Sequence, residues 1–232
     1  MPGWECCSVC KNSSTIQSTT RRFAKRTSSL AWNQEIFEKM ETPAWGICSL
    51  YLFLSMLSAG VVQAAWMSSK LARRTAIPLD RGKTFRGQRI FGDNKTWRGF
   101  VVMVPACGLA FVLWRLIFHS VQAEEVLWPV SLPDYFLVGT AAGLGFMLAE
   151  LPNSFFKRQA GVQPGQAAES KRGRVTCFLI DQVDSVIGSL LAVNLCVPVP
   201  SGTWLILVFG GAVVHLLFNF VLRKLGLRSR AA

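Results

Sequence analysis

The stretch Asp181-Gln182-Val183-Asp184 stands inside a mostly apolar run, residues 176–197, that is long enough to cross a membrane. An aspartate at the centre of a spanning helix costs about 2.5–3.5 kcal/mol on insertion scales, so a chain that carries two needs something to compensate them. Asp181 and Asp184 are three positions apart, so on a helix their carboxylates leave the same face. Two converging carboxylates suit a divalent cation such as Mg²⁺; the alternatives are a helix cap or pairs with nearby basic groups.

Four other apolar runs accompany this one, and together they predict an all-α integral membrane protein with five transmembrane helices. Hydrophobic residues make up 51% of the 232, and the mean hydropathy is +0.34, which soluble domains rarely reach. The predicted spans are residues 44–66, 100–118, 132–151, 176–197 and 204–222. Within the third span, Gly139 and Gly143 form a G-x-x-x-G pair that suits close helix packing.

Three segments are expected along the chain. A single catalytic domain would occupy residues 44–225 and contain all five spans. Residues 1–43 are polar, rich in Ser and Thr, and are expected to form a disordered tail. Residues 226–232 form a basic tail at the other end.

The basic residues lie mainly in the loops between the spans, and they predict the orientation of the chain. There are 25 Lys and Arg against 13 Asp and Glu, a formal net charge of +12. Residues 67–99 hold nine of the basic residues, residues 153–175 hold five, and the loops 119–131 and 198–203 hold none. The positive-inside rule therefore places both basic loops on the cytoplasmic side of the cell (inner) membrane. Because topology and anionic lipids explain this charge, we expect no nucleic-acid partner.

Residue types that bind phosphate are concentrated in the first basic loop, around Gly92-Asp93-Asn94-Lys95-Thr96-Trp97-Arg98-Gly99. Glycines let the backbone approach a ligand closely, lysine and arginine offer charge to phosphate oxygens, and the neutral asparagine and threonine add donors. A basic segment lying on anionic head groups is the alternative, which explains the charge but not the Gly, Asn and Thr between the charges. The candidate pocket residues from this loop are Asp80, Asn94, Lys95, Thr96 and Arg98.

The second basic loop begins at the end of the third predicted span, with Glu150-Leu151-Pro152-Asn153. Lys157 lies one turn beyond Asn153 if the helix continues past the proline. The alternative is ordinary stop-transfer charge, which ends many spans. The candidate pocket residues from this loop are Glu150, Asn153, Lys157, Arg158, Pro164 and Gly165.

Both basic loops and the acidic pair converge on the cytoplasmic half of the membrane, where they are expected to form a polar pocket. Cations that hold a polyphosphate and carboxylates that hold Mg²⁺ are the parts that phosphoryl or nucleotidyl transfer requires. An acceptor that is itself a phosphate needs no nucleophile from the enzyme. The rival interpretations are a transporter or flippase for an anionic solute or lipid, and a non-catalytic membrane anchor.

In their order and spacing, these motifs resemble the CDP-archaeol synthase family, membrane CTP:lipid-phosphate cytidylyltransferases related to the CDP-diacylglycerol synthases. The similarity extends over roughly residues 44–225. It implies Mg²⁺-dependent transfer of CMP from CTP to a lipid phosphate, either phosphatidate-like or an archaeal-type ether lipid, with release of pyrophosphate. The expected partners are CTP, the lipid phosphate and membrane lipids.

The resemblance also implies a role for each motif. Asp181 and Asp184 are expected to bind the metal, and Lys95 and Arg98 to stabilise the charge that develops in the transition state. The CTP site is expected to include four residues of the first loop: Asn94, Lys95, Thr96 and Arg98. Polar residues of the second loop complete the pocket: Asn153, Lys157 and Arg158.

Overall fold

The computed structural model describes residues 40–121, 127–163 and 171–224. The chain divides into two units, residues 1–40 and 41–232, and the second unit holds every helix and strand described below. Most of the predicted tail at residues 1–43, and all of that at 226–232, lies outside the described residues.

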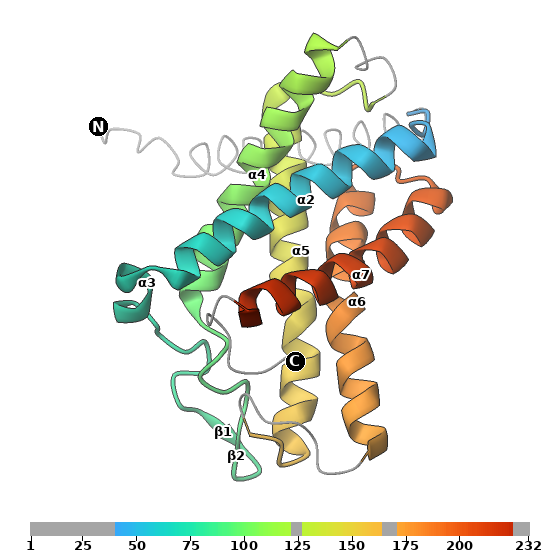
Figure 1. The fold of residues 1–232 in the computed structure, drawn as a ribbon. Helices are drawn as coiled ribbons and strands as arrows, with labels where there is room; N and C mark the ends of the chain where they lie inside the picture. The colour runs from blue at the N-terminus through green and yellow to red at the C-terminus, as the bar shows by residue number, and fades with distance from the viewer. Residues whose placement is uncertain (1–39, 122–126, 164–170, 225–232) are drawn as a thin grey trace, which may run out of the picture. The chain divides into compact units, whose positions relative to one another are not determined.

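Five long helices run through the second unit, where the five spans are predicted. They are α2 (Trp45–Ser68), α4 (Trp97–Ser120), α5 (Leu132–Gln159), α6 (Lys171–Cys196) and α7 (Ser201–Lys224) (Figure 1). Length and apolarity qualify α2, α4, α5 and the segment Leu179–Cys196 of α6 as membrane-crossing. Among the described residues, α7 contributes a shorter apolar segment, Ser201–Val213. The prediction of an all-α membrane protein with five helices is confirmed.

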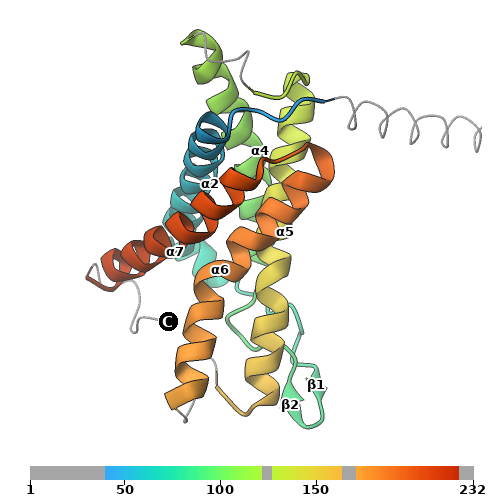
Figure 2. The same ribbon diagram turned by 90° about the vertical axis from the view of Figure 1, so that its right-hand side faces the viewer.

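Helices α5 and α6 run side by side (Figures 1 and 2), and glycines set their separation. A Cβ atom on Gly145 would lie only 2.3 Å from the carbonyl oxygen of Gly188, so neither position accepts a larger residue without moving a backbone. Glu150 follows Gly145 by somewhat more than one turn, and Asp184 precedes Gly188 by about one turn. The close contact therefore brings the polar ends of the two helices together.

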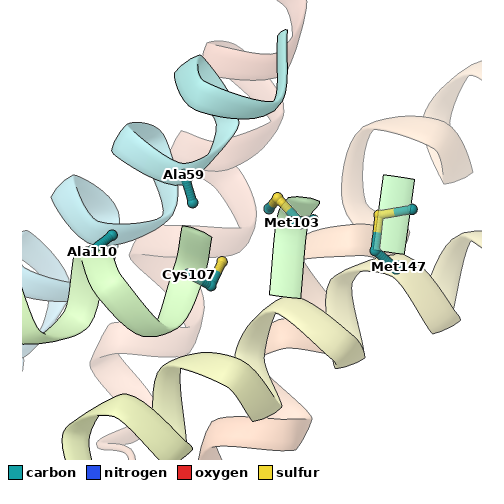
Figure 3. Close-up of a cluster of buried hydrophobic side chains, with 5 residues drawn as sticks. All are labelled: Ala59, Met103, Cys107, Ala110 and Met147. Carbon is teal, nitrogen blue, oxygen red and sulfur yellow. The ribbon is translucent and has the colours of Figure 1, made fainter. Parts of the chain in front are cut away.

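Small residues also let α4 and α5 pack with their backbones close together. A Cβ atom on Gly139 would lie 2.7 Å from the carbonyl oxygen of Cys107, and one on Gly143 would lie 2.9 Å from that of Met103. The predicted G-x-x-x-G pair is thus part of the contact surface of α5. A buried hydrophobic cluster joins α2, α4 and α5 (Figure 3): Ala59, Met103, Cys107, Ala110 and Met147.

Aromatic side chains join the same helices at the ends remote from the basic loops. The ring of Tyr51 contacts Phe111, Trp128 and Tyr135 edge to face, with centroid separations of 5.4, 6.1 and 5.9 Å. The hydroxyl of Tyr51 donates to the Phe111 carbonyl oxygen at 2.7 Å, so its polar group is satisfied inside the core. This cluster joins the helices at the end opposite the acidic pair of α6.

The first basic loop contains regular structure that the all-α prediction does not include. It holds a short helix, α3 (Lys70–Arg74), and an antiparallel hairpin of β1 (Thr84–Phe85) and β2 (Gln88–Arg89) beside the end of α5 (Figure 1). The two turn residues, Arg86 and Gly87, both have positive φ, 52° and 78°. This backbone is typical of tight hairpins, but Arg-Gly is not among the residue pairs that signal one, and two-residue strands show no alternating pattern.

Candidate active site

Helices α5 and α6 both extend beyond their apolar segments on the side of the basic loops. Helix α5 continues through Pro152 to Gln159, about two turns past the predicted end of the span at residue 151. Helix α6 begins at Lys171, although its apolar segment starts only at Leu179. The sequence leaves open whether the helix continues past Pro152; it does, Lys157 lies on it, and polar side chains of the two helices meet there.

Two side chains of α5 bind the acidic pair of α6. The amide of Asn153 donates to Oδ1 of Asp181 at 2.5 Å and to Oδ2 of Asp184 at 3.2 Å. Lys157 Nζ donates to both carboxylate oxygens of Asp181. One amide bridges the two carboxylates, so they converge as their spacing predicts. Both aspartates lie in the body of α6, which excludes a capping role, whereas pairing with a basic group does occur, at Lys157.

Lys95 brings the first basic loop to the same place. It forms an ion pair with Oε2 of Glu150, and the other oxygen of Glu150 accepts a hydrogen bond from the Ser185 hydroxyl at 3.0 Å. The same hydroxyl lies 3.1 Å from Oδ1 of Asp184. A continuous chain of contacts therefore links the first loop, α5 and α6. We call its members the polar network: Lys95, Glu150, Ser185, Asp184, Asn153, Asp181 and Lys157.

The ion pairs of the polar network are partly shielded from solvent. The side chains of Lys95 and Glu150 are 21% and 24% exposed, and those of Lys157 and Asp181 are 17% and 22% exposed. Partial burial strengthens their electrostatic interactions relative to those of fully exposed pairs. The three carboxylates of the network face two ammonium groups, so the network itself carries excess negative charge.

Backbone pairing holds Lys95 at the start of α4. The Leu79 N–H donates to the Lys95 carbonyl oxygen at 2.8 Å, and the Trp97 N–H donates to the Ile77 carbonyl oxygen at 3.1 Å. Gly99 then allows the first turn of α4 to approach α5, since a Cβ atom at this position would lie 2.8 Å from a methionine side chain there. The first loop is thereby fastened at Lys95 itself and just after it, at Trp97 and Gly99.

Asp80 is engaged within the first loop. Its side chain has no exposed surface, and it accepts hydrogen bonds from the Arg89 guanidinium at 2.6 Å and from the N–H groups of Gly82, Phe91 and Gly92 at 3.1, 3.0 and 2.9 Å. Burial raises the pKa of the Asp80 carboxyl, but the guanidinium and the three N–H groups outweigh it and hold the pKa well below its usual range. The sequence predicts that Asp80 lines the pocket. In the structure its carboxylate is bound within the first basic loop, and it stabilises the shape of that loop.

The other predicted residues that the structure describes are not members of the polar network. The guanidinium of Arg98 donates to the Ala72 carbonyl oxygen, and that of Arg158 donates to a carbonyl in the turn after α5. Each keeps a buried Nε–H that no described residue accepts, a donor available to a ligand oxygen. Thr96 is buried immediately before α4, and Asn94 is exposed. The two remaining candidates lie outside the described residues: Pro164 and Gly165.

The oxygen donors of the polar network fit a Mg²⁺ ion that is shared with a phosphate ligand. In the part of the chain that the structure describes, no group of three or more His, Cys, Asp or Glu side chains is placed to enclose a metal ion. Asp181 and Asp184 nevertheless offer hard carboxylate oxygens that converge. Proteins bind Mg²⁺ commonly through one or two carboxylates, with substrate phosphates and water completing its shell.

Ser185 and Arg89 are members of the site that sequence reasoning did not single out. Ser185 directly follows Asp184, and a small polar residue beside an acid in an apolar helix is a weak signal that was available. Arg89 is one of many basic residues in its loop, and no pattern in the sequence distinguishes it as the partner of Asp80. Both act through contacts between segments that only the fold brings together.

Comparisons with known proteins agree with the resemblance. Residues 50–231 match the family model described as CarS-like CDP-archaeol synthase. The chain is 31% identical to the CDP-archaeol synthase of Pyrococcus furiosus, over 70% of this chain and 87% of the relative. It is 31% identical to that of Methanoculleus marisnigri, over 66% and 87%, and 33% identical to that of Halobacterium salinarum, over 66% and 81%.

A solved structure shares the fold. It is described as an intramembrane enzyme for archaeal membrane lipids biosynthesis, and it matches with a TM-score of 0.51 and 23% sequence identity, over 72% of this chain and 91% of that chain. The family match covers most of the chain, including α2 from residue 50 onward, all of α4 to α7 and the polar network. This integral membrane protein therefore belongs to the CDP-archaeol synthase family.

Proposed function

We propose that this chain is a Mg²⁺-dependent enzyme that transfers CMP from CTP to a lipid phosphate and releases pyrophosphate. The observation that carries the proposal is the polar network, in which one ammonium group from the first basic loop and one from the end of α5 meet the carboxylates of α5 and α6. The name shared by the curated relatives, CDP-archaeol synthase, supports an archaeal-type ether lipid phosphate as the acceptor.

In the proposed reaction, an oxygen of the lipid phosphate attacks the α-phosphorus of CTP. The bond between the α-phosphorus and the oxygen that bridges to the β-phosphate breaks, and that oxygen leaves with its electron pair as part of pyrophosphate. Because the acceptor is already an anion, the reaction needs no nucleophile or base from the protein. The protein has to position the two phosphates and stabilise the charge between them.

The polar network supplies these functions through its own residues. Lys95 and Lys157 are the groups proposed to bind the triphosphate, because an ammonium group paired with a carboxylate can exchange it for a phosphate oxygen. Asp181 and Asp184 are proposed to hold Mg²⁺, which when bound neutralises charge on the triphosphate and on pyrophosphate. Asn153 keeps the two carboxylates converged.

The proposed site lies on the cytoplasmic side of the cell membrane. The site lies at the ends of α5 and α6 that point to the same side as both basic loops. The positive-inside rule assigns this side to the cytoplasm. CTP reaches the protein from that side, and a lipid phosphate lies at the depth of the head groups. The two substrates would therefore meet at the membrane surface.

The proposal is tested with purified protein, Mg²⁺, labelled CTP and a panel of lipid phosphates that includes ether and ester lipids. We expect label to enter the lipid with release of pyrophosphate, and we expect Asp184→Asn to lower this transfer by at least about 10³-fold while the protein still folds. Asp134→Asn, which removes a carboxylate from the opposite end of α5, is the matched control and should retain activity. Full activity of Asp184→Asn would contradict the proposal.

A further inference from the structure

We propose that Ser185 is a positioning residue, whose side chain fixes the orientation of the Asp184 carboxylate by linking it to Glu150 on α5. The inference rests on the proposed function, because it gives Asp184 a task for which orientation matters. Ser185 is not among the residues expected to touch substrate or metal. Its effect would be exerted through Asp184.

The hydrogen bonds around Ser185 leave little freedom. Its side chain is almost fully buried, and its Oγ lies 3.0 Å from Oε1 of Glu150 and 3.1 Å from Oδ1 of Asp184. A hydroxyl has a single proton, so it donates to one of these oxygens at a time. The backbone N–H of Ser185 also donates to Oδ1 of Asp184 at 2.7 Å, and the hydroxyl proton lies between the Glu150 and Asp184 carboxylates, within reach of both.

Both oxygens of the Asp184 carboxylate are therefore hydrogen-bonded. Oδ1 of Asp184 is bound by the Ser185 N–H, and Oδ2 accepts from the Asn153 amide at 3.2 Å. Glu150, a like charge on the neighbouring helix, is kept in place by the Ser185 hydroxyl and by Lys95. Without the hydroxyl, Glu150 would lose its donor on α6, and only the Ser185 N–H would remain between the like charges of Glu150 and Asp184.

Ser189 shows what a serine with a purely structural role does on this helix. It lies one turn further along α6, is buried, and donates to the Ala142 carbonyl oxygen of α5 at 3.0 Å. Ser185 and Ser189 thus both bridge α6 to α5 by a buried hydroxyl. They differ in the acceptor, a site carboxylate for Ser185 and a backbone carbonyl for Ser189, so Ser189→Ala is the matched control for Ser185→Ala.

The first measurement is metal binding, independent of turnover. Mn²⁺ is titrated into detergent-purified protein with a non-hydrolysable CTP analogue. We expect Ser185→Ala to weaken Mn²⁺ binding by about 10- to 100-fold, the usual cost of losing a group that orients a metal ligand, and Ser189→Ala to change it by less than about twofold. Equal Mn²⁺ affinities for Ser185→Ala and Ser189→Ala, with both variants folded, would overturn the inference.

The second measurement is a double-mutant cycle with Glu150→Gln, read as the Mg²⁺ concentration that gives half-maximal CMP transfer. If Ser185 acts through Glu150 and Asp184, Ser185→Ala should have a smaller effect in the Glu150→Gln background than in the wild type. Strictly additive effects would count against the link. A wild-type chain that transfers no CMP would overturn the proposed function instead, and the Mn²⁺ titration would then decide the positioning role by itself.

Discussion

A single amide group holds the two aspartates of α6 together. Asn153 donates to both carboxylates, so its loss would remove the one described group that bridges them, leaving Lys157 on Asp181 and Ser185 on Asp184. We expect Asn153→Ala to lower CMP transfer by about 10- to 100-fold and to raise the Mg²⁺ concentration required, because the carboxylates would separate. Initial rates measured over a range of Mg²⁺ concentrations check this expectation.

The control for Asn153→Ala is Gln163→Ala, which removes an exposed side-chain amide in the loop after α5. It should leave the Mg²⁺ dependence unchanged. If Asn153→Ala retained the wild-type dependence on Mg²⁺, the bridge between the two carboxylates would have no part in cation binding.

Asp80 gives the first basic loop a measurable dependence on pH. Its pKa in the folded protein lies below the unfolded value of about 3.9, so its stabilising contribution is fully present above that value and is lost as the pH falls through the folded-state pKa.

At neutral pH we expect Asp80→Asn to speed hydrogen exchange at Gly82, Phe91 and Gly92 by at least about tenfold, because hydrogen bonds to a charged group contribute about 1.5–3 kcal/mol.

Hydrogen exchange measured by mass spectrometry checks this effect, with the α4–α5 core as the internal reference. Asp93→Asn is the companion variant, since Asp93 also pairs with Arg89 but is 70% exposed. It should change exchange little. Unchanged exchange in Asp80→Asn would show that the loop keeps its form without the buried carboxylate.

Residue spacing predicts the convergence of Asp181 and Asp184, because two positions three apart on a helix share a face whatever surrounds them. The contact between Lys95 and Glu150 joins residues 55 positions apart, and no local pattern specifies it. The same holds for the hydrogen bonds of Asp80 to Phe91 and Gly92, which depend on the path of the loop. At the residue scale, the sequence predicts which groups are available and the fold decides which ones meet.

The contact between Gly145 of α5 and Gly188 of α6 sets the distance between these two helices, which carry most of the polar network. Alanine at Gly145 would place its Cβ 2.3 Å from a backbone oxygen of Gly188, and a backbone cannot give way as a flexible side chain can. We expect Gly145→Ala to destabilise the helix pair by about 1–3 kcal/mol and to reduce CMP transfer, since the carboxylates of α6 would move away from Asn153. Thermal unfolding in detergent and transfer assays measure the two effects.

Gly210 on α7 is the matched control for this substitution. Apart from its neighbours along α7, no described residue has an atom within 4 Å of a Cβ built at Gly210, so Gly210→Ala should be neutral or slightly stabilising. If the two alanine variants behaved alike, the α5–α6 contact would be more tolerant than its geometry indicates.

Helix positions could be predicted from the sequence, whereas some helix ends could not. An apolar run of about 20 residues has few outcomes in a membrane other than a spanning helix. The end of α5 was harder to place, because Pro152 and the charges after it are also the ordinary signs of a helix that stops. The structure shows that the helix continues to Gln159, where Asn153 and Lys157 on its surface still have partners on α6.

The charge of the loops predicts how the helical unit is oriented in the membrane. The loop after α5 is expected in the cytoplasm and the end of α4 outside it. We expect Gln163→Cys to react with a membrane-impermeant maleimide only after cells are permeabilised, and Val121→Cys to react in intact cells; both positions are exposed. The unmodified chain provides the background from its own cysteines. The reverse pattern would place the polar network on the wrong side for CTP.

The pairing of Lys95 with Glu150 and of Lys157 with Asp181 has a consequence for the order in which ligands arrive. A nucleotide that drew both lysines away would strip these two carboxylates of their counter-ions, and a free cation would have to compete with ammonium groups already in place. A nucleotide–cation chelate brings phosphate oxygens to the lysines and a cation to the carboxylates at the same time. The local charge then stays nearly balanced. Until ligands arrive, the lysines and carboxylates of the protein occupy each other's binding positions. We therefore expect the protein to bind a nucleotide–cation chelate more readily than the nucleotide or the cation alone.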